Sequence, residues 1–228
     1  MTQAWTQPYL TEQVLNAVPL LLQGDPGTGK STLGPAIHAA SPLRRGPLVV
    51  FDAKSEQITP SRFRSLLQSA EKGTFFIDNT ERLAPGLQAE VVHAQKEALP
   101  PWRLMASSQY SLADLQRRGR VIEEYAELFR DRVLKLARVP KDGVYFRDTL
   151  RRLAGEIGLS VPELSESALE YLQVYEWPGN FRELELILRD LLYRNDGEVV
   201  QLNDLPIFLL RAVNEALNPV ETNRTLFA

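Results

Sequence analysis

The chain has 228 residues, a net charge of −3, no cysteine and two histidines. This composition excludes disulfides, thiolate metal sites and a zinc site made from the histidines alone, and it gives no overall attraction to nucleic acid or to an anionic membrane. The N-terminal segment "MTQAWTQPYL" lacks the basic start and apolar core of a signal peptide, and the longest apolar runs are far shorter than the ~20 residues of a membrane helix. We therefore expect a soluble, cytoplasmic protein that makes no membrane contact.

In the first two thirds of the chain, short apolar runs bounded by turn-forming residues alternate with stretches of helical period. The expected strands are Val18–Leu22, Leu48–Phe51, Thr74–Ile77 and Leu104–Ala106. The expected helices are Ser31–Ala40, Ser61–Ala70, Gly86–Ala98 and Leu112–Phe129. Because parallel strands need long crossovers and are buried on both faces, this alternation predicts an α/β fold with a parallel sheet flanked by helices.

After Phe146 the strand pattern ends, and the rest of the chain has helical periodicity. The expected helices are Phe146–Ile157, Ser165–Tyr175, Asn180–Arg194 and Pro206–Leu217. The sequence thus predicts an α/β domain over residues 1–146, a small all-helical domain over 147–218 and a polar tail over 219–228.

The segment "GDPGTGKS" matches the phosphate-binding pattern GxxxxGK followed by Ser or Thr, between a strand candidate and a helix candidate. Glycines let successive backbone N–H groups turn toward phosphate oxygens, and the helix N-terminus adds partial positive charge. The alternative is a glycine-rich turn that merely precedes a helix. We expect Lys30 to reach the β and γ phosphates of ATP and Ser31 to ligate Mg²⁺. The expected nucleotide-binding residues here are Gly24, Asp25, Pro26, Gly27, Thr28, Gly29, Lys30, Ser31 and Thr32.

The segment "TFFID" predicts a buried strand ending in Asp78, an aspartate suited to hold Mg²⁺ beside the nucleotide. In nucleotide hydrolases of this kind the next residue is usually a glutamate that activates the attacking water, but here it is Asn79. Asparagine orients a water molecule but does not accept its proton, and a positioned general base contributes roughly 10²- to 10⁴-fold. We therefore expect slow hydrolysis. Glu81 is the nearest other carboxylate, and we expect it to be a solvated surface charge.

The segment "WPGNFREL", Trp177–Leu184, closely resembles the WPGNxREL hallmark of the helical lid in the AAA+ domains of sigma-54-dependent transcription activators, the bacterial enhancer-binding proteins. "GTFFIDN" is similar to their GTLFLDE strand, "LQAEVVHAQKE" to their LQxKLLRxLQE helix and "RLMASSQYSL" to their RxxAATNxxL strand. The resemblance covers Leu20 to Pro206. It implies an AAA+ P-loop NTPase fold that holds ATP and Mg²⁺ between an α/β domain and a helical lid, often at a subunit boundary in a ring. It also implies that Arg182 senses the γ-phosphate.

Besides Asn79, the chain departs from this family at three places. Family members carry a long insertion, with a GAFTGA loop that contacts sigma-54, where this chain has only about nineteen residues, Ser55 to Gly73. Where the family has roughly GRFREDLYYRL, this chain has "GRVIEEYAELFRDRV", so Ile122 replaces the first of the arginines that act on a neighbouring subunit's nucleotide. Arg130 or Arg132 is the candidate for the second. Gln109, which we expect to contact the nucleotide, stands where the family has asparagine.

These features predict an ATP-binding AAA+ module of the transcription-regulator type, with weak or absent hydrolysis and no sigma-54 contact loop. An active ATPase that remodels another partner, or a non-catalytic interaction module, is the alternative. The expected ligands are ATP and ADP, and the expected partners are copies of the chain or a related AAA+ protein, together with an unidentified protein. After Pro206 the sequence predicts one helix, which is too short for a DNA-reading unit of two or three helices, so direct DNA binding is not indicated.

Overall fold

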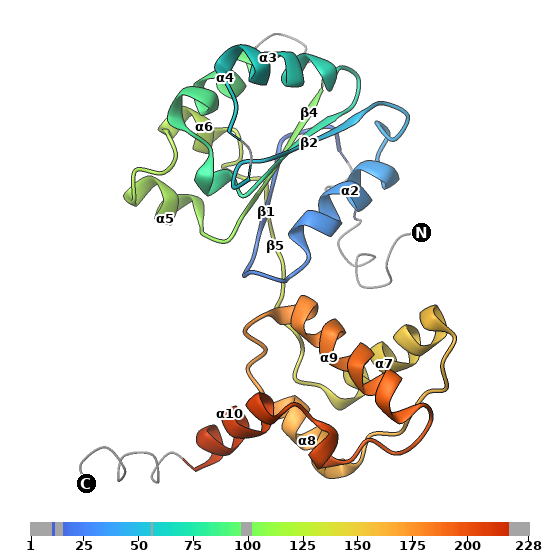
Figure 1. Cartoon of the computed structure of the whole chain (residues 1–228). Coiled ribbons are helices and arrows are strands. Elements are labelled where there is room, and N and C mark those ends of the chain that lie inside the picture. The colour runs from blue at the N-terminus through green and yellow to red at the C-terminus, as the bar shows by residue number, and fades with distance from the viewer. Residues whose placement is uncertain (1–10, 12–15, 56, 97–101, 219–228) are drawn as a thin grey trace, which may run out of the picture. The chain divides into compact units, whose positions relative to one another are not determined.

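The computed structural model describes residues 11, 16–55, 57–96 and 102–218, and the chain divides into two compact units, Met1–Leu136 and Ala137–Ala228 (Figure 1). Each unit has an apolar core of its own. Within the described residues, no helix combines the length and the apolar character needed to cross a membrane. The predicted polar tail over 219–228 lies outside these residues.

The described part of the first unit contains a parallel sheet of five strands in the order β2-β3-β4-β1-β5. The strands are β1 (Leu20–Gln23), β2 (Leu48–Asp52), β3 (Thr74–Asp78), β4 (Arg103–Ser108) and β5 (Val133–Lys135). The first four lie where the sequence predicts strands. Strand β5 was not predicted, because its three residues are too few to form a recognisable apolar pattern. Since the strands are parallel, their carboxyl ends share one edge of the sheet, where Asp52 pairs in register with Asp78 and Gln23 pairs with Ser108.

Two apolar clusters form on the sheet because successive side chains of a strand point to opposite faces. In one cluster, Leu22, Phe76 and Met105 pack with Leu33 and Ile37 of helix α2 (Lys30–Ala40). The other cluster includes the strand residues Leu21, Phe51, Phe75, Ile77, Leu104 and Ala106. These pack with buried residues of α3 (Pro60–Ser69), α4 (Pro85–Gln95), α5 (Leu112–Arg117) and α6 (Glu123–Glu127). The three central strands β3, β4 and β1 are therefore buried on both faces, as the sequence predicts, whereas the edge strands β2 and β5 are only partly buried.

Helix α2 approaches the sheet closely at Gly34. A Cβ atom at this position would lie 2.6 Å from Cε1 of the buried Phe76 ring, which is closer than side chains approach one another. The following Pro35 has no N–H to donate, yet α2 continues to Ala40. Gly34 therefore lets the helix that begins with Lys30 and Ser31 lie against the β3 strand.

The prediction of one helix over Leu112–Phe129 was wrong, because α5 and α6 are separate helices. Gly119 lies between them with a φ of 61°, in the left-handed region that interrupts a right-handed helix. After this turn, the N–H of Arg120 donates to the carbonyl of Leu115 at 2.8 Å. Helix α4 ends at Gln95, and Ala98, the predicted end of that helix, lies outside the described residues.

The described part of the second unit contains the helices α7 (Gly143–Ile157), α8 (Glu166–Val174), α9 (Asn180–Asn195) and α10 (Ile207–Leu217). Asp142 caps α7, since its carboxylate accepts a hydrogen bond from the N–H of Val144 at 3.0 Å. Val139 and Phe146 belong to the core of this unit. The compact unit therefore begins at Ala137, whereas the sequence placed the domain boundary after residue 146.

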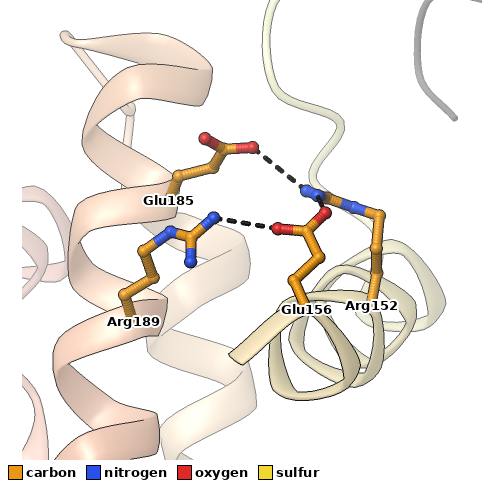
Figure 2. A network of polar contacts seen from close by, with 4 residues as sticks. All are labelled: Arg152, Glu156, Glu185 and Arg189. Atoms are coloured by element: carbon orange, nitrogen blue, oxygen red, sulfur yellow. Dashed lines mark hydrogen bonds and ion pairs between the residues drawn. The ribbon is translucent and has the colours of Figure 1, made fainter. Parts of the chain in front are cut away.

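An ion-pair network joins α7 to α9 on the surface of the second unit (Figure 2). Glu156 accepts from Arg152 at 2.6 Å and from Arg189 at 2.9 Å, and Arg152 also reaches Glu185 at 3.1 Å. Partial burial alone would raise the pKa of Glu156, but the two arginines hold this pKa below its usual value. The network therefore links the two helices through a carboxylate shared by two guanidinium groups.

Candidate nucleotide-binding site

The loop between β1 and α2 has the backbone geometry of a phosphate cradle. Gly27 and Gly29 have φ angles of 78° and 90°, which glycine adopts without steric cost. The Thr28 hydroxyl donates to the Asp25 carbonyl at 2.8 Å and closes the turn. Gly24 begins the loop, and a Cβ atom there would lie 2.8 Å from Oγ1 of Thr28. The tight turn thus brings the chain directly into the N-terminus of α2, which is a favourable place for an anion.

Lys30 folds back over this loop. Its ammonium donates to the carbonyl of Gly24 at 2.6 Å and to the carbonyl of Asp25 at 2.9 Å, and the residue is only 9% exposed. An ammonium group and the N-terminus of a helix, gathered at one small loop, are the donors that a phosphate chain requires. The residues of the loop therefore fit the triphosphate of a nucleotide.

Ser31 and Asp78 meet at the carboxyl edge of the sheet. The Ser31 hydroxyl donates to Oδ2 of Asp78 at 2.6 Å, and the Ser107 hydroxyl donates to Oδ1. Hydroxyl and carboxylate oxygens are ligands that suit Mg²⁺, which usually keeps several waters and takes further ligands from phosphates. Among the described residues no group of three or more His, Cys, Asp or Glu is placed to hold a metal ion by itself. The Ser31 and Asp78 pair fits Mg²⁺ that is bound together with a nucleotide.

Ser107 was not predicted as a site residue. It is fully buried in β4. Its hydroxyl donates to Asp78 and accepts a hydrogen bond from the N–H of Asn79 at 3.0 Å. Nothing in the sequence distinguishes it from the neighbouring Ser108, whose hydroxyl instead accepts from the N–H of Tyr110 at 2.9 Å. Only the alternation of side chains along β4 decides which serine reaches the Asp78 carboxylate.

Asn79 connects Asp78 to a second acidic residue that the sequence analysis missed. The side-chain amide of Asn79 donates from Nδ2 to Oδ1 of Asp52 at 2.8 Å. Asp52 is the last residue of β2, and it also accepts from the N–H of Lys54 at 3.0 Å and from the Ser55 hydroxyl at 2.7 Å. The signal that could have found Asp52 is its position, since an acid that ends a predicted parallel strand lies at the edge where the strand of Asp78 also ends.

The expectation that Glu81 is a solvated surface charge was wrong. Glu81 is 8% exposed, and its Oε2 atom accepts no hydrogen bond from the described residues. It lies in a short 3-10 turn, Thr80–Arg82, that directly follows Asn79. In the same turn the Thr80 hydroxyl shares a hydrogen bond of 2.6 Å with the buried hydroxyl of Tyr125. The turn therefore packs into the interior of the first unit and is not an open loop at the surface.

The two candidate arginines after α6 are both exposed, but they differ in their contacts. Arg130 forms an ion pair with Glu127 three residues earlier, and this hydrogen bond raises the pKa of Arg130. Within the described residues, the Arg132 guanidinium makes no ion pair, while the Arg132 carbonyl accepts from the N–H of Leu21. Gln109 is half-buried and directly follows β4 at the carboxyl edge of the sheet.

Arg182 belongs to the second unit and lies in the first turn of α9, where it is exposed. The turn before α9 is unusual because Trp177 and Asn180 both have positive φ angles, of 50° and 48°. Trp177 is buried and donates from Nε1 to the carbonyl of Leu172 at 2.9 Å, and Glu183 accepts from the N–H of Gly179 at 2.7 Å. The "WPGN" segment therefore fixes the start of α9 and the place of Arg182 on it.

Comparisons with known proteins agree with this architecture. Residues 145–221 match the model of the AAA+ ATPase lid domain family. The chain is 26% identical over 213 residues to the nitrogen fixation protein VnfA of Azotobacter vinelandii, with 79% of this chain and 41% of that protein covered. It is 30% identical over 220 residues to the HTH-type transcriptional regulatory protein TyrR of Haemophilus influenzae, with 83% of this chain and 66% of that protein covered.

Among solved structures, NtrX from Brucella abortus in complex with ATP superimposes with a TM-score of 0.75 at 18% identity, over 96% of this chain and 60% of that chain. At this identity the likeness shows the fold. The fold and the loop before α2 define an AAA+ P-loop protein, in which a five-stranded parallel sheet with helices is followed by a helical lid.

In sequence, the chain is similar to the AAA+ ATPase lid family over residues 145–221 and to regulatory proteins such as TyrR over most of its length. It spans well under half the length of VnfA.

Proposed function

We propose that the first unit binds ATP with Mg²⁺, and that the chain is a regulatory AAA+ module of a transcription regulator with weak or absent hydrolysis. The observation that supports nucleotide binding is the loop before α2, where Lys30 covers the cradle and Ser31 contacts Asp78 at 2.6 Å. Two relatives support the assignment, because TyrR is a transcriptional regulatory protein and NtrX has been solved with ATP.

In this proposal each residue of the loop has a defined task. The backbone from Gly24 to Gly29 surrounds the phosphates, and the Lys30 ammonium moves from the carbonyls of the loop to the β and γ phosphates. Ser31 and Asp78 hold Mg²⁺, which neutralises charge on the phosphates when it is bound. Arg182 and Gln109 are further proposed contacts of the nucleotide.

Two features support the proposal that hydrolysis is weak and that sigma-54 is not contacted. The residue after Asp78 is an amide, which does not take a proton from the attacking water at neutral pH. In the described residues between β2 and β3, the regular structure is the single helix α3. The absence of any further helix or strand among these described residues supports the proposal that the chain lacks a contact loop of the sigma-54 activator kind and that its regulated partner is a different protein.

Calorimetric titration with Mg–ATP and Mg–ADP tests this proposal. We expect both nucleotides to bind, and we expect Lys30→Ala to weaken ATP binding about tenfold or more because a charged hydrogen-bond donor is lost. Lys96→Ala, which removes an exposed lysine at the end of α4, should leave the affinity unchanged and serves as the control.

Phosphate release measured on the same samples tests the second half of the proposal. We expect a turnover number well below ~1 s⁻¹, the lower end of the typical range of kcat for enzymes. If the wild-type chain binds neither nucleotide, the proposal is wrong. If it binds ATP and turns it over at ~1 s⁻¹ or faster, the module is an active ATPase instead.

A further inference from the structure

An ionised carboxylate lies beside the amide that stands where a catalytic glutamate is usual. Asp52 and Asp78 are neighbours in register on β2 and β3, so both side chains lie at the carboxyl edge of the sheet that also carries the nucleotide loop. Asn79 follows Asp78 and donates to Asp52 at 2.8 Å. The Asp52 and Asn79 pair therefore lies at the same edge of the sheet as Ser31 and Asp78.

The charge of Asp52 determines which end of the Asn79 amide faces it. Burial alone would raise the pKa of Asp52, but hydrogen bonds from the Ser55 hydroxyl, the Lys54 N–H and the Asn79 amide lower it below its usual value. Asp52 is therefore ionised at neutral pH and accepts hydrogen bonds only. The amide must present Nδ2 to this carboxylate, because its oxygen would be repelled.

The opposite end of the amide remains open to a ligand. Within the described residues, no group donates a hydrogen bond to Oδ1 of Asn79. The backbone of Asn79 is held independently, since its N–H donates to Oδ1 of Asp78 at 3.2 Å and to the Ser107 hydroxyl at 3.0 Å. Asn79 has φ 57° and ψ 50°, a left-handed conformation that asparagine tolerates better than most residues. Backbone and side chain are thus both fixed, with one carbonyl oxygen unused.

We propose that Asp52 is a positioning residue for slow ATP hydrolysis, which holds the Asn79 amide so that Oδ1 accepts a hydrogen bond from the attacking water. The inference rests on the proposed ATP binding. An amide that orients water is sufficient for slow turnover in P-loop proteins. The water oxygen bonds to the γ-phosphorus, the bond from the γ-phosphorus to the bridging oxygen breaks, and ADP leaves with that electron pair. One proton of the water stays on the attacking oxygen, and the other passes to another oxygen of the released phosphate.

The first test compares the wild type with Asp52→Asn and Asp52→Ala. An asparagine at 52 can pair with Asn79 in either orientation, and an alanine removes the partner, so both changes release Oδ1 from its fixed direction. We expect kcat to fall about tenfold in both variants, because orientation of the water is lost, while the calorimetric Kd for ATP changes less than about twofold. Glu71→Gln removes an exposed charge of the same unit and should alter neither value.

The second test moves the carboxylate from position 52 to position 79. Asn79→Glu alone places two carboxylates in contact, and their repulsion displaces the new acid from the water. Adding Asp52→Asn replaces the repelling charge with an amide that can donate to the new acid. Both variants carry the same backbone strain at position 79, so that strain cancels in the comparison. We expect the double variant to turn over ATP about tenfold or more faster than Asn79→Glu, and faster than the wild type.

The outcomes separate this inference from the proposed function. Absence of ATP binding by the wild type would overturn both. If ATP binds and Asp52→Asn retains the wild-type kcat, or if Asn79→Glu equals the double variant, the positioning role of Asp52 is wrong while ATP binding stands. ATP binding without turnover in any of these proteins would also overturn the role of Asp52. Circular dichroism and the ATP affinity identify any variant that is misfolded.

Discussion

Thr80 and Tyr125 form a buried polar pair in the first unit. Both residues are fully buried, and their hydroxyls share a hydrogen bond of 2.6 Å. Burial raises the pKa of Tyr125, so its hydroxyl keeps its proton throughout the physiological range. The pair joins the turn after Asn79 to helix α6. Nothing in the sequence of α6 predicts this contact with the turn beside the nucleotide loop.

Removing both hydroxyls of this pair should cost less than the sum of the two separate removals. Thr80→Val and Tyr125→Phe each leave one buried hydroxyl unsatisfied, and we expect each to lower the free energy of unfolding by about 1–3 kcal/mol. The double variant should lose clearly less than the sum of the two, since no unpaired group remains. Urea unfolding followed by circular dichroism measures this, with Tyr193→Phe as the control for an exposed hydroxyl. Additive losses would show that the hydroxyls do not stabilise each other.

At the same scale, the residues in the loop before α2 could be predicted, but several residues around them could not. The pattern from Gly24 to Ser31 is local, because the geometry of the loop is set by residues that are adjacent in the chain. Asp52 and Ser107 come from other strands, and only the register of the sheet brings them to Asp78 and Asn79. Whether a side chain such as Glu81 is buried likewise depends on a turn whose direction is set by tertiary contacts.

At the scale of helices and strands, the α7 and α9 pair is held by the shared carboxylate of Glu156. We expect Glu156→Gln to lower the free energy of unfolding at pH 7 by about 0.5–1 kcal/mol, a modest value because the ion pairs are partly exposed. The pKa of Glu156 is lower in the folded state than in the unfolded chain. Its contribution is therefore complete above the unfolded pKa and disappears as pH falls through the folded pKa.

The difference between wild type and Glu156→Gln should accordingly shrink as the pH is lowered from 7 to below 4.5, the ordinary value of a glutamate. Urea titrations at both pH values measure it. Glu163→Gln is the matched control, because among the described residues the Glu163 side chain makes no ion pair. An equal difference at both pH values would mean that the charge of Glu156 is not what stabilises the pair.

Most of the helices and strands could be predicted, since the apolar period distinguishes strands of four to six residues from amphipathic helices. The errors occur where tertiary structure overrides the local pattern. The apolar residues around α5 and α6 keep a helical period across Gly119, but the backbone turns there with φ 61°. Strand β5 has three residues and is recognisable only through its pairing with β1.

At the scale of the whole molecule, the exposed arginines after α6 bear on assembly. Arg132 has a free guanidinium among the described residues, whereas Arg130 is paired with Glu127. If sites are shared between copies, Arg132 is the better candidate to reach a neighbour's phosphates. We expect Arg132→Ala to lower turnover about 10³-fold or more at high protein concentration, and Arg130→Ala to have a much smaller effect.

The measurement is ATP turnover per subunit as a function of protein concentration, with light scattering to follow assembly. Shared sites require the wild-type turnover to rise with concentration. A turnover that is independent of concentration, or that survives the combined Arg130→Ala and Arg132→Ala changes, would mean that each chain acts alone.

The contact of Gly34 with Phe76 has a consequence for the nucleotide loop. Because residue 34 has no side chain, α2 can pack directly against the Phe76 ring of β3. This packing sets the distance between the sheet and the nucleotide loop before α2. A methyl group there would sit 2.6 Å from the ring and force α2 away from the sheet or turn the ring aside. Lys30 and Ser31 begin this helix, so the hydrogen atom at position 34 sets the gap that Ser31 must span to reach Asp78.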